Sequence, residues 1–204
     1  MHVISIMETT TKTNYSWPTY KWLSNRTGNV DDMWRHINKY QLEKEEGADW
    51  FDDLFYSTGD GKSTLDPEDD AATANWGTAW KTPDEEQINE LFNLNNCSRE
   101  WKVRNDGITG VLFISKRNGK RIFLPAAGYR TGYDLRNFGT NGYYASSQIE
   151  DPYRFREIFV HYYIDPVVVG NTIYSSNYFC FQWNTADRSN GYTVRPVLVK
   201  KRKR

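Results

Sequence analysis

The chain of 204 residues contains only two cysteines, Cys97 and Cys180, and neither belongs to a Cys-x-x-Cys or Cys/His pair with metal-ligand spacing. Structural metal sites need several such ligands close together, so we expect no metal site and no cofactor. One disulfide would fit an exported protein, and two free thiols fit the sequence equally well. At this length the chain can bury a core without cross-links.

The chain also lacks net charge and long apolar runs. Lys plus Arg and Asp plus Glu number 26 each, so no overall field attracts nucleic acid or a membrane surface. No apolar run reaches transmembrane length, and residues 1–7 have neither the basic nor the apolar region of a signal peptide. The basic run at residues 200–204 is typical of a solvated tail, with a nucleic-acid contact as the weaker alternative. We therefore expect no nucleic-acid partner and no membrane insertion.

A recognisable catalytic set is missing as well. The three histidines, His2, His36 and His161, are isolated in the sequence, and no Gly-x-Ser-x-Gly motif is present. Trp183-Asn184 is followed by threonine where calcium-dependent lectins carry aspartate, and Glu150–Pro152 only distantly resembles their other calcium loop. The sequence predicts that the protein is not an enzyme.

Aromatic side chains are abundant. The chain has 14 Tyr, 10 Phe and 8 Trp, which together make up 16% of its residues. Packing in a β-rich core accounts for most of these rings, but exposed Tyr and Trp also give the rigid contact area that binding surfaces use. The first 56 residues are interpreted as an N-terminal extension that packs on the main domain. It contains an aromatic segment at residues 15–23 and, by its apolar spacing, a short amphipathic helix between residues 31 and 46.

Two helix starts follow this extension. Asp66 can cap a helix that has Pro67 at its first position, with further acids near the positive end of the helix. Thr82 can cap a second helix, with Pro83 at the first position and Glu85 completing a capping box. Capping explains the acidic residues of these stretches better than a catalytic or metal site does. The acidic residues are Asp66, Glu68, Asp69, Asp84 and Glu85.

The rest of the chain has the pattern of antiparallel strands and turns. Residues 101–104, 110–115 and 121–124 predict three strands, and Asn118-Gly119 is a strong hairpin signal. A loop is expected over residues 128–142, and a long insert holds Pro152 and Pro166. Further strands are expected at residues 143–147, 178–183 and 192–199. Two helices followed by strands predict an α+β fold with an antiparallel sheet.

Many segments, in order along the chain, carry a resemblance to one known family. They are Asn14–Trp22, Thr64–Ala72, Asn75–Gly77, Trp80, Thr82-Pro83, Cys97, Gly107–Gly110, Asn118-Gly119, Ile122–Arg130, Gly142–Tyr144, Ser146-Ser147 and Ser189–Val197. Together they resemble the major paralogous domain family named from Fibrobacter succinogenes. The resemblance covers most of the chain. It implies a C-type-lectin-like fold, with two helices packed on a twisted antiparallel β-sheet that carries long loops.

The same resemblance suggests a domain organisation and a location. The family domain would occupy residues 57–199, between the extension at 1–56 and the basic tail at 200–204. Members are common among secreted or cell-surface proteins of Bacteroidetes. The chain departs from them in lacking their usual first strand and export signal, and residues 154–176 differ from the family's short Ser/Asn/Tyr-rich stretch. Secretion or surface display is therefore expected from the resemblance alone.

No catalytic residues carry over from this family, and we expect a non-enzymatic ligand-binding or adhesion module. Tyr, Asn, Arg and Ser are interleaved over residues 129–188, a combination typical of recognition surfaces on a rigid sheet. The candidate ligand-binding residues are Tyr133, Arg136, Asn137, Tyr153, Arg154, Tyr174, Asn177, Trp183, Asn184 and Arg188. The expected partner is a protein or a glycan.

A sharper hypothesis makes this chain the variable protein of a diversity-generating retroelement, because such target proteins resemble it in fold. One alternative is an enzyme of the formylglycine-generating or another type on the same fold. It would need a deep pocket at Cys97 or Cys180, or at His161 with a carboxylate. The other alternative is a structural surface protein that self-associates and has no ligand.

Overall fold

The computed structural model describes residues 15–16, 37, 39–40, 60–151, 154–169 and 172–199. Over these residues the fold is mixed, mostly antiparallel β-structure with two helices, which confirms the α+β prediction. None of the helices in this part of the chain combines the length and the apolar character that a membrane span requires. Cys97 and Cys180 are both free thiols.

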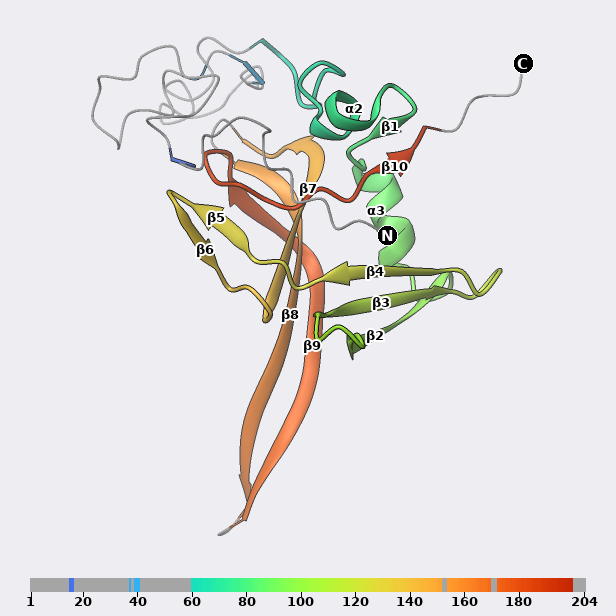
Figure 1. Ribbon diagram of the computed structural model, residues 1–204, viewed down its shortest axis with the longest axis vertical. Coiled ribbons are helices and arrows are strands. Elements are labelled where there is room, and N and C mark those ends of the chain that lie inside the picture. Colours follow the sequence, from blue (N-terminus) through green and yellow to red (C-terminus); the bar gives the residue numbers. More distant parts are fainter. Residues whose placement is uncertain are drawn as a thin grey trace, which may run out of the picture.

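The central sheet has three antiparallel strands in the order β7 (Asn141–Ile149), β8 (Arg154–Val169) and β9 (Thr172–Asp187). β8 and β9 pair along their whole length in an unbroken register, and in Figure 1 they extend together beyond the other strands. The sequence predicted a strand at 178–183 and an insert around Pro166. The prediction of an insert was wrong, because residues 154–169 form strand β8. Pro166 lies beyond the part of β8 that pairs with β7, where a missing N–H is tolerated.

A second sheet follows the predicted meander closely. Its strands are β2 (Cys97–Val103), β3 (Thr109–Ser115) and β4 (Arg121–Pro125), in the order β2-β3-β4. The Asn-Gly turn joins β3 to β4, with Gly119 in the left-handed region at φ 66°. Two shorter pairs complete the described strands: β1 (Trp80–Lys81) with β10 (Val197–Leu198), and β5 (Tyr129–Thr131) with β6 (Asp134–Arg136).

The two helices begin later than the sequence predicted. α2 (Ala71–Trp76) is capped by Asp70, whose side chain accepts a hydrogen bond from the Ala72 N–H. The prediction of a cap at Asp66 was wrong, because residues 67–69 form a turn that brings the Asp70 N–H to the Asp66 carbonyl at 2.9 Å. The acidic turn thus precedes the helix instead of opening it.

The second helix, α3 (Glu85–Phe92), is capped by Asp84 in a capping box with Gln87, and the predicted box of Thr82 with Glu85 was wrong. Thr82 is instead buried, and its N–H and hydroxyl donate to the two carboxylate oxygens of Asp70 at 2.8 and 2.7 Å. Because Thr82 is bound to Asp70, its side chain does not cap α3, and Asp84 caps the helix instead.

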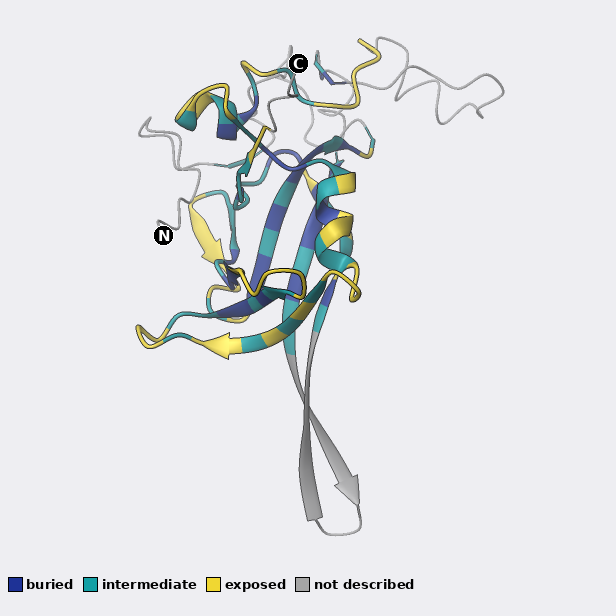
Figure 2. Ribbon diagram, turned by 90° about the vertical axis from the view of Figure 1, so that its right-hand side faces the viewer, coloured by how far each residue is buried: buried dark blue, intermediate teal, exposed yellow. Residues whose placement is uncertain are grey.

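The main core lies against one face of the central sheet. α3 and the β2-β3-β4 sheet cover that face, and Figure 2 shows buried residues alternating along the strands beneath them. The core residues are Ile88, Val111, Phe113, Leu124, Tyr144, Ile158, Val160 and Phe181. The opposite face of the central sheet is left for β5, β6 and the segment that follows β9.

That following segment was predicted as one strand over residues 192–199. Only Val197-Leu198 forms a strand, in β10, and Thr193 makes a single parallel bridge to Tyr144. The prediction was therefore wrong for most of the segment. Pro196 has no N–H to donate, which interrupts any ladder before β10.

The described residues of the N-terminal extension dock on the domain. Ile37 and Tyr40 are buried, Ile37 lies in a β-bridge, and Tyr40 lies in a bend with a positive φ of 60°. The helix predicted between residues 31 and 46 is therefore wrong at these positions. The remainder of that helix, residues 17–23 of the aromatic segment, and the tail at 200–204 lie outside the described residues.

Candidate ligand-binding surface

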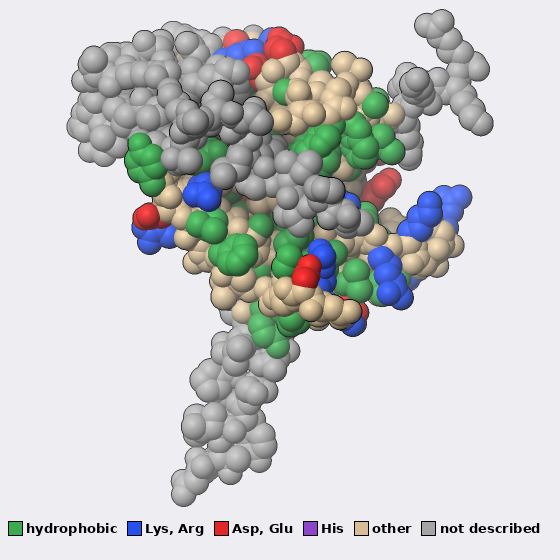
Figure 3. All heavy atoms as spheres, viewed as in Figure 1, with side chains coloured by type: hydrophobic (Ala, Val, Ile, Leu, Met, Phe, Trp, Pro, Cys, Tyr) green, Lys and Arg blue, Asp and Glu red, His purple; other side chains and the backbone are tan. Residues whose placement is uncertain are grey.

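The β5–β6 hairpin carries three large apolar side chains that are exposed. Tyr133, in the turn, is 69% exposed, Leu135 on β6 is 46% exposed, and Phe138, just after β6, is 67% exposed. One exposed apolar residue is ordinary, whereas several on one short segment are typical of a contact surface. Figure 3 shows hydrophobic side chains gathered over this part of the molecule. We term residues 129–138 the aromatic hairpin.

Backbone hydrogen bonds hold the aromatic hairpin to separate parts of the chain. Arg130 and Gly191 exchange two bonds of 2.8 Å, and Gly132 and Tyr15 exchange two bonds of 2.6 and 2.9 Å. Both pairs are isolated antiparallel bridges. Both anchors lie on β5 or in the turn that follows it, and β6 is held by its pairing with β5, so the backbone under the exposed side chains is fixed.

A cluster of aromatic rings lies between the hairpin and the central sheet. The Tyr129 ring packs edge-on against Tyr143 at 4.9 Å and stacks on Tyr192 at 5.8 Å. Tyr192 contacts Phe155 at 5.0 Å, and Tyr143 contacts Phe159 at 5.2 Å. Edge and offset contacts of this kind stabilise a fold beyond the area that they bury. These five rings thus connect the hairpin to the central sheet.

Asn137 ends the hairpin in a conformation that few residue types adopt. Its φ is 55°, in the left-handed region where asparagine is enriched among non-glycine residues. Its side-chain N–H donates to the Tyr143 hydroxyl at 2.8 Å, and the Asn141 side chain donates to the same hydroxyl at 2.9 Å. Asn137 therefore fixes the turn in addition to presenting its amide at the surface.

Gly128 offers a direct test of how the hairpin is positioned. Its φ is 67°, and a Cβ added there would lie 2.1 Å from the Arg136 carbonyl oxygen. Gly119 has a similar φ of 66° but nothing within 4 Å of an added Cβ. We expect Gly119→Ala to lower the free energy of unfolding by about 1–2 kcal/mol, the penalty of the left-handed conformation alone.

Gly128→Ala should lower the free energy of unfolding by clearly more than that, because the clash forces β5 away from β6. Urea unfolding of both variants, followed by tryptophan fluorescence, measures the difference between them. Equal losses would show that the close approach of Gly128 to Arg136 has no energetic consequence.

Charged and polar groups border the exposed apolar side chains. Arg136 and Asp134 form an ion pair of 2.6 Å on β6, with both side chains more than half exposed. The Arg130 guanidinium donates to the Tyr133 carbonyl at 3.5 Å. Exposed ion pairs of this kind add little stability. Apolar side chains bordered by charges have the composition of a recognition surface, in which the rim is polar.

The structure brings three of the predicted binding residues together on the aromatic hairpin, namely Tyr133, Arg136 and Asn137. Tyr174 and Asn177 lie on β9, paired with Val167 and Ile164 of β8 respectively. Both residues therefore belong to the central sheet and not to the aromatic hairpin. Tyr153 lies outside the described residues.

Trp183 and Asn184 on β9 are engaged within the fold. The Trp183 indole N–H donates to the Asn89 side chain on α3 at 2.9 Å, and the Arg156 guanidinium lies over the indole ring at 4.9 Å. The Asn184 side chain donates to Glu157 at 3.0 Å. These contacts give both residues a role in holding the sheet together.

The two remaining arginines also contact their own chain. Arg154 at the start of β8 pairs with Asp151 at 2.6 Å. Arg188, just after β9, is only 7% exposed and donates to the backbone carbonyls of Tyr40 at 2.8 Å and Lys39 at 2.7 Å. Arg188 thus fastens the N-terminal extension to the domain.

Two residues of the aromatic hairpin were missed at the level of sequence, Leu135 and Phe138. Apolar residues are usually taken for core, and nothing local to Leu135 or Phe138 predicts exposure. The neighbouring glycines, Gly132 and Gly139, are the available signal, because they indicate a turn with little room for a buried core.

A row of polar residues crosses the central sheet on the face that the aromatic cluster covers. Asn141, His161 and Cys180 are cross-strand partners on β7, β8 and β9, and His161 Nδ1 lies 2.5 Å from Asn141 Oδ1. The Cys180 thiol donates to Gln182 at 3.0 Å. Burial raises the pKa of this thiol, which works against a nucleophilic thiolate.

Glu157 lies on β8 four residues before His161 of this row and is 1% exposed. One of its carboxylate oxygens accepts from Asn184, and the other has no hydrogen-bond partner among the described residues. Burial raises the pKa of the Glu157 carboxyl from 4.5 to about 8. The group is therefore largely protonated, and uncharged, at neutral pH.

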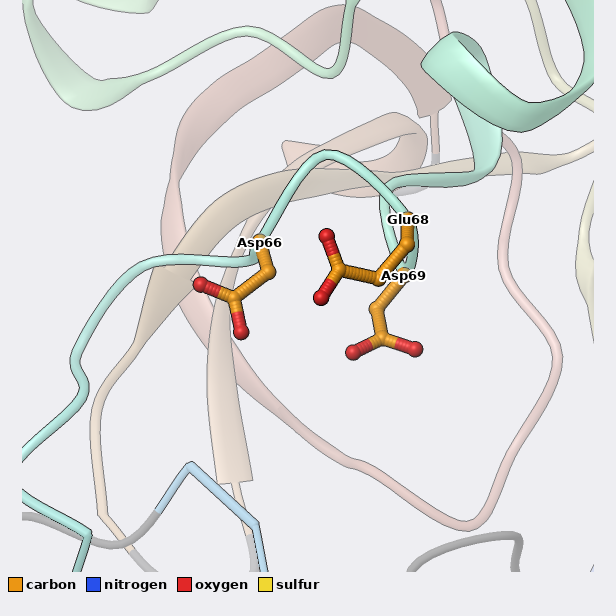
Figure 4. Close-up of side chains that lie close together, drawn as sticks. All are labelled: Asp66, Glu68 and Asp69. Carbon is orange, nitrogen blue, oxygen red and sulfur yellow. The ribbon is translucent and has the colours of Figure 1, made fainter.

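The acidic turn before α2 gathers Asp66, Glu68 and Asp69, whose carboxylate oxygens lie within 4.8 Å of one another (Figure 4). The Lys39 ammonium pairs with Asp69 and with Asp66, the latter at 3.3 Å. The Tyr40 hydroxyl donates to Asp69 at 2.7 Å and accepts from the Asp66 N–H at 2.9 Å. The cluster is thus the place where the described residues of the N-terminal extension dock, and Lys39 compensates the charges of Asp66 and Asp69.

A shallow groove of ≈ 530 Å³ lies at the β2–β3 end of the second sheet. Its lining residues are Lys102, Val103, Arg104, Asn105, Asp106, Leu112 and Phe123. It contains neither cysteine nor any residue of the Asn141–His161–Cys180 row. The groove is therefore separate from the thiol that an enzyme on this fold would use.

No family model, no curated protein and no solved structure matches the chain.

Proposed function

We propose that this protein is a non-enzymatic ligand-binding or adhesion module that holds a protein or glycan on the aromatic hairpin. The observation that carries the proposal is the exposure of Tyr133, Leu135 and Phe138 on a hairpin whose backbone is fixed. Exposed apolar side chains in fixed positions lose little conformational entropy on binding, because their backbone is already ordered. The polar rim of Arg136 and Asn137 supplies hydrogen bonds that select the ligand.

The thiol chemistry favours this proposal over an enzyme. The Asn141–His161–Cys180 row has an amide where a catalytic carboxylate was expected, and burial raises the pKa of the thiol. A reactive cysteine needs the opposite, an environment that lowers its pKa. Cys97 lies on β2, in a different sheet from this row.

Removal of the exposed rings is expected to abolish binding while leaving the fold intact. An array of glycans and bacterial surface proteins first identifies a ligand for the full chain. Tyr133→Ala and Phe138→Ala should each weaken its affinity at least tenfold, since buried aromatic anchors of interfaces contribute about 2 kcal/mol or more. Leu94→Ala is the matched control, because Leu94 is 55% exposed but lies beyond the end of α3.

The three variants should unfold within about 0.5 kcal/mol of the unmodified protein, as surface substitutions usually do. Titration calorimetry and urea unfolding separate affinity from stability. Full affinity in both hairpin variants would overturn the aromatic hairpin as the binding surface.

We also propose that the fold is C-type-lectin-like and that the chain belongs to the major paralogous domain family. The support is the order of the segments that resemble that family, together with two helices that precede the β2-β3-β4 sheet and the central sheet along the chain. Secretion or surface display follows from this proposal. An experimental structure superposed on a C-type-lectin-like domain tests the fold.

The sharper form of the proposal is that the chain is the variable protein of a diversity-generating retroelement. Its support is the resemblance in fold and the gathering of Tyr133, Arg136 and Asn137 on one exposed hairpin. The neighbouring DNA should then encode a reverse transcriptase and hold a near-copy of the 3′ coding region that differs at adenines. Absence of both would remove the retroelement and leave the binding module standing.

A further inference from the structure

The outer edge of β9 is a long strand edge to which no other strand pairs in the described part of the chain. β9 is the last strand of the β7-β8-β9 sheet and spans 16 residues. An antiparallel strand directs its backbone N–H and C=O groups alternately to its two sides. About half of the polar backbone groups of β9 therefore point away from β8, in the arrangement that accepts an additional strand.

The β9 edge lacks the features that usually prevent strand addition. Residues 172–186 contain no Lys, Arg, Asp, Glu, Pro or Gly, and the pairing with β8 shows no bulge. Charged side chains, proline and bulges are the common means of protecting an edge. Other edges of this protein have them: the part of β8 beyond β7 contains Asp165 and Pro166, and β2 contains Arg99, Glu100 and Lys102.

We propose that β9 pairs antiparallel with β9 of a second copy of this chain and joins the two central sheets into one. The absence of charge favours this occupant, because a strand paired with its own copy places like charges near one another wherever it carries any. Asp187 is the one charged residue of β9, and the antiparallel arrangement puts its two copies at opposite ends of the interface.

The symmetry of such a pair locates its axis. A two-fold axis perpendicular to the sheet keeps each side chain on its own face, so the residue at the axis pairs with its own copy. The middle of β9 falls between Phe179 and Cys180, and an axis at either residue keeps nearly the whole strand paired. Two Cys180 residues then lie opposite or diagonally adjacent, with Cα atoms about 4.5–8 Å apart.

Cysteine cross-linking in solution tests this arrangement with a built-in control. Cys97→Ser leaves Cys180 as the only thiol, and a short bifunctional maleimide should convert this variant to covalent dimer. Cys180→Ser retains only Cys97, on β2, and should stay uncross-linked under the same conditions. Efficient cross-linking through Cys97 with none through Cys180 would overturn the proposal.

Sedimentation velocity of the full chain from low to high micromolar concentration gives an independent measurement. The unmodified protein and Cys180→Ser should sediment as dimers, and Cys180→Lys should shift to monomer because two ammonium groups would face each other near the axis. Ser98→Lys adds the same charge to an exposed position on β2 and should remain dimeric. Circular dichroism establishes that each variant is folded. A monomer at every concentration, or a dimer that survives Cys180→Lys in folded form, would overturn the β9 pairing.

Discussion

Glu157→Gln is expected to stabilise the protein by roughly 5 kcal/mol above pH 8, at about 1.4 kcal/mol for each tenfold change in proton affinity, and by little below pH 4.5. The side chain is 1% exposed on β8, and among the described residues only Asn184 donates a hydrogen bond to it. Glutamine keeps an oxygen for Asn184 and removes the ionisable group. The substitution therefore isolates the energetic penalty of a buried carboxylate.

The direction in which stability changes with pH follows from the two pKa values of the Glu157 carboxyl, 4.5 in the unfolded chain and about 8 in the fold. Below pH 4.5 both states are protonated, and the group does not affect stability. As pH rises from 4.5 to 8 the unfolded chain releases the proton while the fold retains it, so the free energy of unfolding falls. Above pH 8 the loss is complete. The free energy of unfolding of the unmodified protein should fall between pH 4.5 and pH 8. Glu157→Gln should not show the part of this fall that the Glu157 carboxyl causes.

Urea unfolding between pH 4 and pH 9, followed by tryptophan fluorescence, measures this difference directly. Subtracting the two curves removes the contribution of the titrating groups that do not interact with residue 157. Glu100→Gln on β2 is the control, because its side chain is half exposed and it should change stability by less than about 0.5 kcal/mol at every pH. Parallel curves for the unmodified protein and Glu157→Gln would contradict the buried, protonated carboxyl.

Local sequence was sufficient for the β2-β3-β4 sheet but not for the β8–β9 ladder. The meander has short apolar strands and an Asn-Gly turn, so all its information lies within neighbouring residues. Pro166 instead argued against a strand, and β8 tolerates it because the pairing of β8 with β7 ends at His161. Whether a proline is compatible with a strand depends on which edge is paired, and a local pattern does not contain that information.

The helix caps show the same limit at shorter range. Thr82 and Asp84 are both good capping residues, and propensity alone does not separate them. Two hydrogen bonds from Thr82 to the buried Asp70 decide the matter in favour of Asp84. The acids of the preceding turn were predicted to lie at the start of the helix, and in the structure Asp69 instead receives Lys39 and Tyr40.

The candidate binding residues divide by burial in a way that composition could not predict. Tyr133, Arg136 and Asn137 follow glycines in a short hairpin and reach the surface together. Arg188 belongs to the same set of residue types, yet it contacts residues 148 and 149 positions away in the chain. Tyr, Asn and Arg serve recognition and internal hydrogen bonding equally well, so only the fold separates the two uses.

Arg188→Ala is expected to lower the free energy of unfolding by roughly 3 kcal/mol. The substitution removes the hydrogen bonds from the guanidinium to the Lys39 and Tyr40 carbonyls, and charged hydrogen bonds contribute about 1.5–3 kcal/mol each. The loss should also release the N-terminal extension. Tyr40 is fully buried and joins the extension to the acidic turn through Asp69, so a loosened Tyr40 exposes both. Limited proteolysis should therefore remove the extension from the variant faster than from the unmodified protein.

Arg136→Ala separates this structural role from the general effect of removing an arginine. Arg136 has the same charge and stem but is more than half exposed and pairs only with Asp134 in the described structure, so its loss should change stability by less than about 0.5 kcal/mol. Arg188→Lys should fall between the two, since one ammonium replaces a planar group that reaches two carbonyls at once. Equal stability of Arg188→Ala and Arg136→Ala, with equal proteolysis of the extension, would contradict Arg188 as the residue that fastens the extension. Arg188 would then remain a candidate ligand-binding residue, as the sequence predicted.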